Sequence, residues 1–374
     1  MERSELDFAL TEEQEMLRQT VRDFAEQRVR PAHEHVDHAA VHPTDLVDGL
    51  KELGLFGVLA PVDQGGAGMG FLAHVLCVEA LSEAGGVMGG IVAAHGAVVD
   101  ALAMDGRHGD VVAALASWEL LGAPALQEDD HGAVACTATA GETPRLTGRK
   151  TLVPFPGRAG VFLVLAKEPA GVTGLYLVKA DARGVRHESR QETLGLLGLE
   201  TAVLELDGAP AVKLGFAGAL IDVGATVRSV LTTIAGLRIA VAALLSGVAR
   251  GAIGHALRYA GERKQFDKPL LDFVAIRERL ARADGRVAAA RGLVHSAARL
   301  RDRGEPSALA AARARAFAAE AAMSAVDDAL QIYGGYGYSR EYPVERFYRD
   351  ARFIGFGEGH PSVLANDAVN GMLA

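Results

Sequence analysis

The first apolar positions of the chain repeat at helical spacing: Leu17, Val21 and Phe24. Thr11 followed by Gln14 matches the capping-box pattern that begins many helices. Pro31 follows this apolar run and predicts that the helix stops before it. The glycine-rich stretch 63–68 predicts a loop, and the apolar run over 70–103 predicts further helices.

The last part of the chain carries two longer apolar stripes with the helical period. The first stripe comprises Val230, Ile234, Leu237, Val241, Leu244 and Val248. The second comprises Phe273, Ile276, Leu280, Ala283, Val287, Ala290 and Val294. Stripes of this length predict long helices that pack side by side in a bundle.

Between these helical parts, glycine and proline cut the chain into short apolar runs. The runs that predict strands are Val134–Cys136, Val161–Leu165, Leu175–Val178 and Ala202–Leu206. The fold class is therefore α+β and mostly α, with an N-terminal helical domain over 1–108, a middle β domain over 109–222 and a C-terminal helical bundle domain over 223–374. Because no G-x-G-x-x-G follows a predicted strand, the fingerprint of a nicotinamide-binding fold is absent.

Composition narrows the class of protein further. The 374 residues are 49% apolar and 23% charged, an ordinary globular balance. A net charge of −9 argues against general binding of nucleic acid, which needs a basic surface. Cys77 and Cys136 give neither a disulfide framework nor a metal-ligand cluster. The N-terminus is acidic and polar, and no uninterrupted apolar run of membrane-spanning length stands out. We therefore expect a cytoplasmic protein without metal, nucleic acid or membrane partners.

Three stretches in the C-terminal half could carry chemistry. Glu262–Pro269 offers an arginine whose forked donors suit phosphate oxygens. Gln331–Tyr338 contains paired glycines, which let a ligand approach the backbone closely. Gly357–Pro361 places Glu358 between two glycines, where partial burial would make its carboxylate a usable base. Each stretch taken alone is more typical of a solvated helix end, a helix C-cap or a surface glutamate.

These stretches, taken together and in this order along the chain, resemble the acyl-CoA dehydrogenase family, and the resemblance covers nearly the whole chain. The family's R-x-Q-F-G-x-P stretch is matched by Arg263, Gln265, Phe266 and Pro269. Its Q-x-x-G-G-x-G-Y stretch is matched by Gln331, Gly334, Gly335, Gly337 and Tyr338. Its R-E-Y-P-V-E-R and Y-R-D-A stretches are matched by 340–346 and 348–351, and Glu358 follows at the family's spacing. The N-terminal loop of Pro61, Gly65, Gly66 and Gly68 is similar to the family's P-x-x-x-G-G-x-G.

This resemblance implies a middle β-barrel or sandwich domain, a C-terminal four-helix bundle, and FAD bound between the two. It implies that Glu358 takes the α-proton of an acyl-CoA thioester while a hydride leaves the β-carbon for the flavin, as in fatty acid metabolism. The implied cofactor-binding residues are Arg263, Gln265, Phe266, Gln331, Gly334 and Gly335. Arg238 and Gly359 are the implied substrate-binding residues. An electron-transfer flavoprotein is the implied electron acceptor, and a homo-oligomeric dimer or tetramer the implied assembly.

Two loops of the middle domain depart from the family pattern. Ala123–Asp130 stands where the family has T-E-P-x-A-G-S, and Leu152–Pro156 stands where it has W/F-I-T/S-N-G. Pro154 replaces the hydroxyl residue of the second loop and has no N–H to donate. In the family these loops hold the subunit's own flavin, whereas R-x-Q-F and Q-x-x-G-G reach the flavin of a neighbouring subunit. The chain thus keeps the contacts to a neighbour's flavin better than the contacts to its own.

These departures leave two alternatives to a self-sufficient dehydrogenase. The chain could be a degenerate subunit of a hetero-oligomeric acyl-CoA dehydrogenase, with weak or no FAD binding of its own. It could also carry out a different flavin chemistry on the same scaffold, as a monooxygenase or as a carrier-protein-linked oxidase. The retained Glu358 argues against a wholly inactive subunit and against a monooxygenase.

Overall fold

The structure is a computed structural model that describes residues 9–129, 134–215 and 223–356. The described part begins with a helical region made of α1 (Glu12–Phe24), the π turn η1 (Ala25–Val29), α2 (Arg30–Ala39), α3 (Thr44–Glu52), the 3-10 turns η2 (Leu55–Gly57) and η3 (Val62–Gln64), α4 (Gly70–Ala84), α5 (Gly86–Asp105) and α6 (Gly109–Ala116). The capping box of Thr11 and Gln14 is confirmed, with both reciprocal hydrogen bonds present. The predicted stop before Pro31 is wrong. The π turn carries the helical path forward, and Pro31 lies in the first turn of α2, where a missing N–H costs little.

The middle region is one curled mixed sheet with the strand order β6-β7-β3-β2-β4-β5-β8, and β1 is added beside β4. Its strands are β1 (Gly122–Ala125), β2 (Thr137–Ala138), β3 (Arg145–Pro154), β4 (Val161–Lys167), β5 (Thr173–Lys179), β6 (Val185–Arg190), β7 (Thr201–Pro210) and β8 (Val212–Lys213). The strand expected over Val134–Cys136 is wrong. The N–H groups of Ala135 and Cys136 donate to the Glu128 carboxylate instead of to a neighbouring strand. The range 109–222 expected for the β domain also contains helix α6, before the first strand begins at Gly122.

Within the described residues, the C-terminal region contains four α-helices, and the first two of them carry the predicted apolar stripes. These elements are α7 (Val223–Glu262), the hairpin of β9 (Lys264–Gln265) and β10 (Lys268–Pro269), η6 (Leu270–Asp272), α8 (Val274–Asp302), α9 (Ala308–Tyr333), η7 (Gly334–Tyr338) and α10 (Val344–Phe356). Helix α7 packs against α8, α9 and α10. Two helices, α5 and residues 230–262 of α7, have the length and hydropathy of membrane spans, but 83% and 78% of their apolar windows are buried inside the protein.

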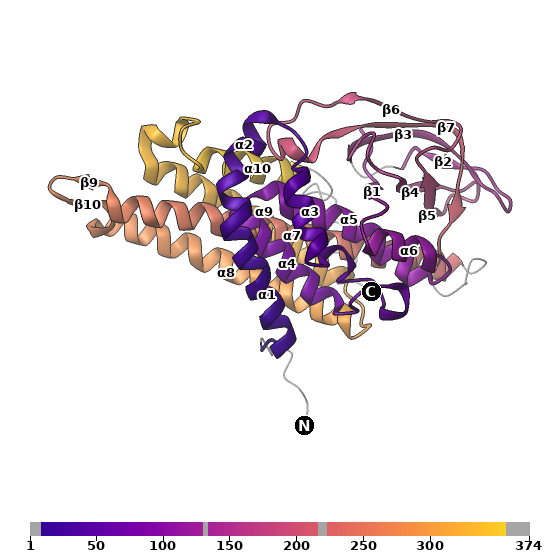
Figure 1. Ribbon diagram of the computed structural model, residues 1–374, viewed down its shortest axis with the longest axis horizontal. Coiled ribbons are helices and arrows are strands. Elements are labelled where there is room, and N and C mark those ends of the chain that lie inside the picture. The colour runs from indigo at the N-terminus through magenta and orange to yellow at the C-terminus, as the bar shows by residue number, and fades with distance from the viewer. Residues whose placement is uncertain (1–8, 130–133, 216–222, 357–374) are drawn as a thin grey trace.

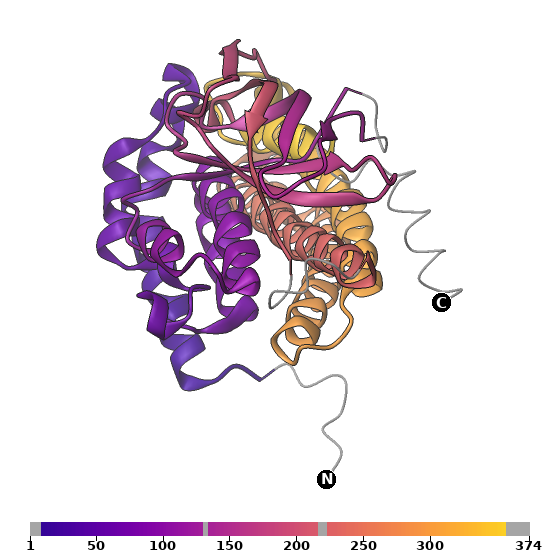
Figure 2. The same ribbon diagram turned by 90° about the vertical axis from the view of Figure 1, so that its right-hand side faces the viewer.

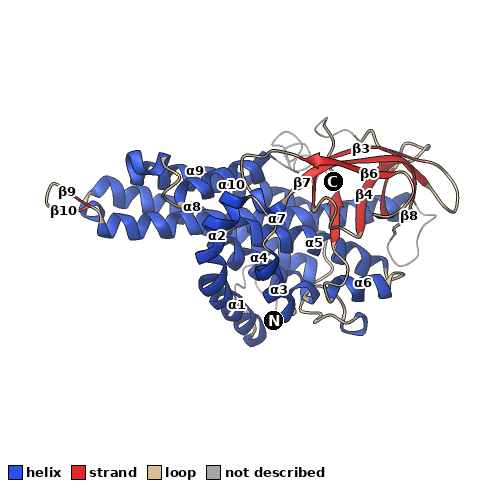
Figure 3. Cartoon of the chain, turned by 45° about the horizontal axis from the view of Figure 1, so that its top comes forward, coloured by secondary structure: helices blue, strands red, loops and turns tan. Residues whose placement is uncertain are grey.

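The sheet and the β9–β10 hairpin lie at opposite ends of the molecule (Figure 1). Figure 3, coloured by secondary structure, shows the same arrangement, with long helices that run side by side between the two ends. Figure 2 shows that the sheet lies across the helical layer. Strand β1 packs on α5 and β5 packs on α7. The sheet therefore meets the helices at one end of the molecule, and the β9–β10 hairpin lies far from this junction.

A buried ionic cluster joins α4 to α8 in the helical core. The Glu79 carboxylate accepts hydrogen bonds from Arg291 at 2.9 Å and pairs with His295 at 3.2 Å. Burial alone would raise the pKa of Glu79, but the imidazole of His295 and the guanidinium of Arg291 outweigh it and hold that pKa at about 2. The folded state therefore favours the ionised carboxylate.

We expect the ion cluster of Glu79 to make the fold sensitive to acid. Because the pKa is lower in the folded chain than the ordinary value of 4.5, its contribution is fully present above pH ~4.5 and is lost as the pH falls toward ~2. Glu79→Gln should lower the free energy of unfolding at pH 7 by about 3 kcal/mol, because it leaves the partly buried Arg291 without its carboxylate partner. Urea unfolding of the wild type and of Glu79→Gln at pH 7, 4 and 3 should show that the difference between their free energies of unfolding becomes smaller as the pH falls. A difference that stays constant across the three pH values would contradict the assignment.

Candidate active site

A cavity opens where the curled sheet meets the helices. It encloses about 770 Å³ of space between atoms, including the part that opens to solvent. The sheet side contributes Pro124, Leu126, Gln127, Thr151, Leu152, Pro154 and Thr201. The helical side contributes Gly90, Ala93 and Ala94 of α5, Leu237, Val241 and Leu244 of α7, and Phe353 and Ile354 of α10. Leu196 and Leu199 complete the lining.

Backbone hydrogen bonds fix the sheet side of this cavity. The N–H of Thr151 donates to the carbonyl of Gln127 at 2.9 Å, and the N–H of Leu152 donates to Oε1 of Gln191 at 3.0 Å. Just behind them, Nζ of Lys150 donates to the Glu128 carboxylate at 2.5 Å, with both side chains buried. Both loops that depart from the family pattern therefore contribute described residues to the cavity wall.

The loop 193–199 forms a second part of the wall and is held against α10. The N–H of Leu196 donates to Oδ1 of Asp350 at 2.7 Å. A Cβ atom on Gly195 would lie 2.3 Å from the carbonyl oxygen of Arg349, so this approach of two backbones requires glycine. Leu196 itself has a φ of +49°, which is rare for a branched side chain. The loop is therefore strained and needs the contacts with α10 to keep its shape.

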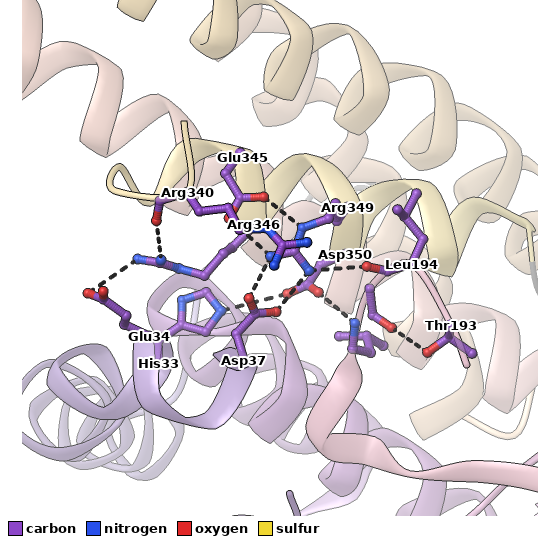
Figure 4. A network of polar contacts seen from close by, with 12 residues as sticks. His33, Glu34, Asp37, Thr193, Leu194, Arg340, Glu345, Arg346, Arg349 and Asp350 are labelled. Carbon is purple, nitrogen blue, oxygen red and sulfur yellow. Dashed lines mark hydrogen bonds and ion pairs between the residues drawn. The ribbon is translucent and has the colours of Figure 1, made fainter. Parts of the chain in front are cut away.

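A polar network around α10 supplies those contacts (Figure 4). Arg349 pairs with Asp37 of α2 at 2.5 Å and with Glu345 at 2.6 Å, and donates to the carbonyl of Leu194 at 3.1 Å. The buried His33 lies 3.8 Å from Asp350. Helix α2, the loop 193–199 and α10 are thus joined beside the cavity, although they are far apart in sequence.

The cavity's chemistry suits a largely apolar ligand with one polar edge. None of the described residues that line it is charged. The side chains that can hydrogen-bond are on the sheet side, and Oγ1 of Thr201 is buried there without a hydrogen-bond partner. A flat heteroaromatic ring such as that of a flavin needs apolar walls and polar groups at its edge, so the residues present fit the flavin ring of FAD. Within the described ranges, no group of His, Cys, Asp and Glu has the arrangement of a metal site.

The sequence-predicted cofactor residues do not lie at this cavity. Arg263, Gln265 and Phe266 are exposed on and beside the β9–β10 hairpin, at the far end of the bundle (Figure 1). The structure brings Arg263 to the second predicted stretch, where its guanidinium lies over the ring of Tyr336, 5.7 Å from the ring centroid. We call the following exposed residues, drawn from the two stretches, the distal patch: Arg263, Gln265, Phe266, Gln331, Gly334, Gly335, Tyr336 and Tyr338.

Of the other predicted site residues, one lies next to the cavity lining and two lie outside the described residues. Arg238 is buried on α7, next to the cavity-lining Leu237. Glu358 and Gly359 lie outside the described residues, and α10, whose Phe353 lines the cavity, is the last described element before them.

Sequence analysis missed the polar residues of the sheet wall, Gln127, Thr151 and Thr201. A usable signal was the position of Thr201 as the polar start of a predicted apolar strand. A second signal was Lys150, a cation in a run that becomes apolar. Both signals show that polar groups are buried in this part of the sheet, but neither shows which cavity they face.

Comparisons with known proteins agree with this architecture. Residues 11–109 match the family model described as "Acyl-CoA dehydrogenase, N-terminal domain", and residues 227–373 match "Acyl-CoA dehydrogenase, C-terminal domain". The chain is 34% identical over 366 residues to the 3-(aryl)acrylate reductase of Clostridium sporogenes, covering 94% of this chain and 96% of that protein.

Two solved structures are similar over almost the whole chain. A chain in the structure of the electron transferring flavoprotein of Acidaminococcus fermentans has a TM-score of 0.90 and 30% identity, with 98% of this chain and 99% of that chain covered. Butyryl-CoA dehydrogenase from Megasphaera elsdenii has a TM-score of 0.89 and 28% identity, with coverage of 98% and 100%. The chain therefore belongs to the acyl-CoA dehydrogenase family, whose members are FAD-dependent oxidoreductases acting on the CH–CH bond of acyl-CoA thioesters.

Proposed function

We propose that this chain dehydrogenates an acyl-CoA thioester between its α- and β-carbons, with Glu358 as the base that takes the α-proton. The observation that carries the proposal is the uncharged cavity between the sheet and α5, α7 and α10. Helix α10 contributes Phe353 and Ile354 to that cavity, and Glu358 follows four residues after Ile354 in the sequence.

The cavity walls explain how the chain's own residues would favour this reaction. Apolar surroundings disfavour a charged carboxylate, so they raise its pKa toward the range of an efficient base. Leu237, Val241 and Leu244 offer an apolar surface to the acyl group, and the small residues Gly90 and Ala93 leave room beside it. FAD, when bound, accepts the hydride that leaves the β-carbon. Arg238, beside Leu237, and Gly359 are the proposed substrate-binding residues.

The distal patch is proposed to serve the FAD of a second copy of the chain. Its exposed arginine and glycines suit the phosphates and polar edges of a nucleotide. However, the β9–β10 hairpin beside the patch lies at the opposite end of the molecule from the sheet, which forms one wall of the cavity (Figure 3). A homo-oligomer, as a dimer or a tetramer, would bring the distal patch of one copy to the cavity region of another. Arg263, Gln265, Phe266, Gln331, Gly334 and Gly335 are the proposed contacts.

The electron acceptor and the compartment are also part of the proposal. We infer that an electron-transfer flavoprotein reoxidises the enzyme, supported by the likeness to a chain in the Acidaminococcus fermentans structure. A cytoplasmic setting is supported by Cys77 and Cys136, which are free buried thiols.

A second candidate is a subunit that depends on a partner for its flavin. The observation that favours it is Pro154, which brings neither a hydroxyl group nor an N–H to the cavity wall. The ordered cavity favours a self-sufficient subunit, because the altered loops still line a space that fits the flavin ring.

The flavin content of the chain purified alone tests both candidates. We expect a yellow homo-oligomer with one FAD per chain, whose flavin absorbance bleaches when an acyl-CoA is added without oxygen. Arg263→Ala should weaken FAD binding about 10- to 100-fold, the usual effect of losing a charged hydrogen bond. Lys264→Ala is the matched control, since Lys264 is exposed on the same hairpin. A colourless protein that gains FAD only with a partner chain would favour the second candidate.

A further inference from the structure

Thr201 presents a hydroxyl group that the protein leaves without a partner. The residue is only 4% exposed, and its Oγ1 is buried and makes no hydrogen bond. A buried hydroxyl without a partner costs free energy, so such groups are rare unless a ligand or water satisfies them. Thr201 lines the cavity between the sheet and the helices. Thr201 therefore brings an unpartnered hydroxyl group to the lining of this cavity.

The backbone around Thr201 is fixed, so this hydroxyl group is held in place. The carbonyl of Thr201 accepts from the N–H of Gln191 at 2.7 Å, and the adjacent Glu200 carbonyl accepts from the N–H of Phe155 at 2.9 Å. Thr201 is also stiff at its first side-chain dihedral because it is β-branched. The side chain of Thr201 is thus limited to a small set of orientations beside the cavity.

Pro154 lies directly opposite Thr201 in the ladder between β3 and β7. Directly paired residues of antiparallel strands present their side chains on the same face of the sheet, and both residues line the cavity. Pro154 can neither donate nor accept through its side chain and has no N–H. Of these two paired residues, therefore, only Thr201 has a side chain that can hydrogen-bond to a ligand.

The distribution of polar groups identifies the part of the ligand that Thr201 would contact. The sheet wall carries Gln127, Thr151 and Thr201, whereas the described residues of the helical wall are apolar. An acyl chain is apolar along its length and suits the helical wall. A flavin ring has a polar edge of nitrogen and carbonyl oxygen atoms and suits the sheet wall. We propose that the Thr201 hydroxyl group hydrogen-bonds the polar edge of the flavin ring and replaces a contact that Pro154 cannot make; this inference rests on the proposed function.

A pair of matched variants tests the role of Thr201. Thr201→Val keeps the shape of the side chain and removes the hydroxyl group. Thr233→Val is the control, because Thr233 on α7 is also buried, at 1% exposure, and has an unpartnered Oγ1, but does not line the cavity. FAD released from each holoenzyme on dilution gives the dissociation constant by fluorescence. We expect Thr201→Val to weaken FAD binding about 3- to 10-fold and to shift the flavin absorption spectrum. Thr201→Ser keeps a hydroxyl group and should therefore show the FAD affinity and the flavin spectrum of the wild type.

The stability of the flavin-free proteins separates binding from folding. Both valine variants should melt at the same temperature as the flavin-free wild type or higher, because each removes an unsatisfied buried group. Equal FAD affinity and an unchanged spectrum in Thr201→Val would overturn the inference, as would an equal loss of affinity in Thr233→Val. A wild-type chain that binds no FAD would overturn it too. A wild type that binds FAD but is not reduced by any acyl-CoA would refute the proposed function and leave the Thr201 comparison valid.

Discussion

Glu358→Gln is expected to lower kcat about 10²- to 10⁴-fold, the usual contribution of a positioned general base. Glutamine keeps the size and polarity of the side chain but cannot accept the α-proton. The described lining of the cavity is uncharged, so no described lining residue offers a carboxylate that could take over the role. FAD content and melting temperature should match those of the wild type. The measurement is anaerobic single-turnover bleaching of the flavin by an acyl-CoA, which reports the chemical step directly.

Glu341→Gln is the matched control for this experiment. Glu341 lies in the same C-terminal segment but is exposed, at the turn before α10. Its variant should reduce FAD at the wild-type rate. If Glu358→Gln also bleached at that rate with a good substrate, Glu358 would not be the base. If instead both variants lost FAD, the loss of turnover would reflect disruption of the C-terminal segment.

The helical part of the fold could be predicted from sequence because its signals are local. The capping box of Thr11 and Gln14 and the apolar stripes of α7 and α8 each depend on residues close in the chain. Strands β4 and β5, which are buried over most of their length, also gave clear apolar runs. Strands β3 and β6 gave no such signal, because polar or exposed residues occupy most of β6 and much of β3. Their pairing with β7 is decided by partners far away in sequence.

The two parts of the candidate site also differ in how far the sequence predicts them. The distal patch could be proposed from sequence, because its two short stretches match two motifs of the family in the same order along the chain. The cavity could not be found, because Gly90, Ala93 and Leu237 look like ordinary packing residues in sequence. They become a cavity wall only when the sheet is laid across α5 and α7. The rewritten loops suggested a weakened flavin site, whereas the structure shows that they still line the cavity.

Arg349→Met is expected to lower the free energy of unfolding by about 3–5 kcal/mol, the usual cost of breaking one side of a buried ion pair. The variant leaves the carboxylate of Asp37 buried without its partner; the side chain of Asp37 is only 6% exposed. It also removes the hydrogen bond to the Leu194 carbonyl, which helps to hold the loop 193–199 against α10. Because Leu196 and Leu199 of that loop line the cavity, the folded variant should also bind FAD more weakly. Urea unfolding and flavin release measure the two effects.

A double-mutant cycle shows whether the effect of Arg349 passes through Asp37. Asp37→Asn should cost much less in the Arg349→Met background than in the wild type, with a coupling energy of about 1–3 kcal/mol for a pair in direct contact. Arg277→Met is the control, because its pair with Asp272 is exposed at 63% and 48% and should contribute less than about 1 kcal/mol. Additive costs for Arg349 and Asp37 would show that the ion pair does not link α2 to α10. The loop beside the cavity would then depend on Asp350, whose carboxylate accepts the N–H of Leu196.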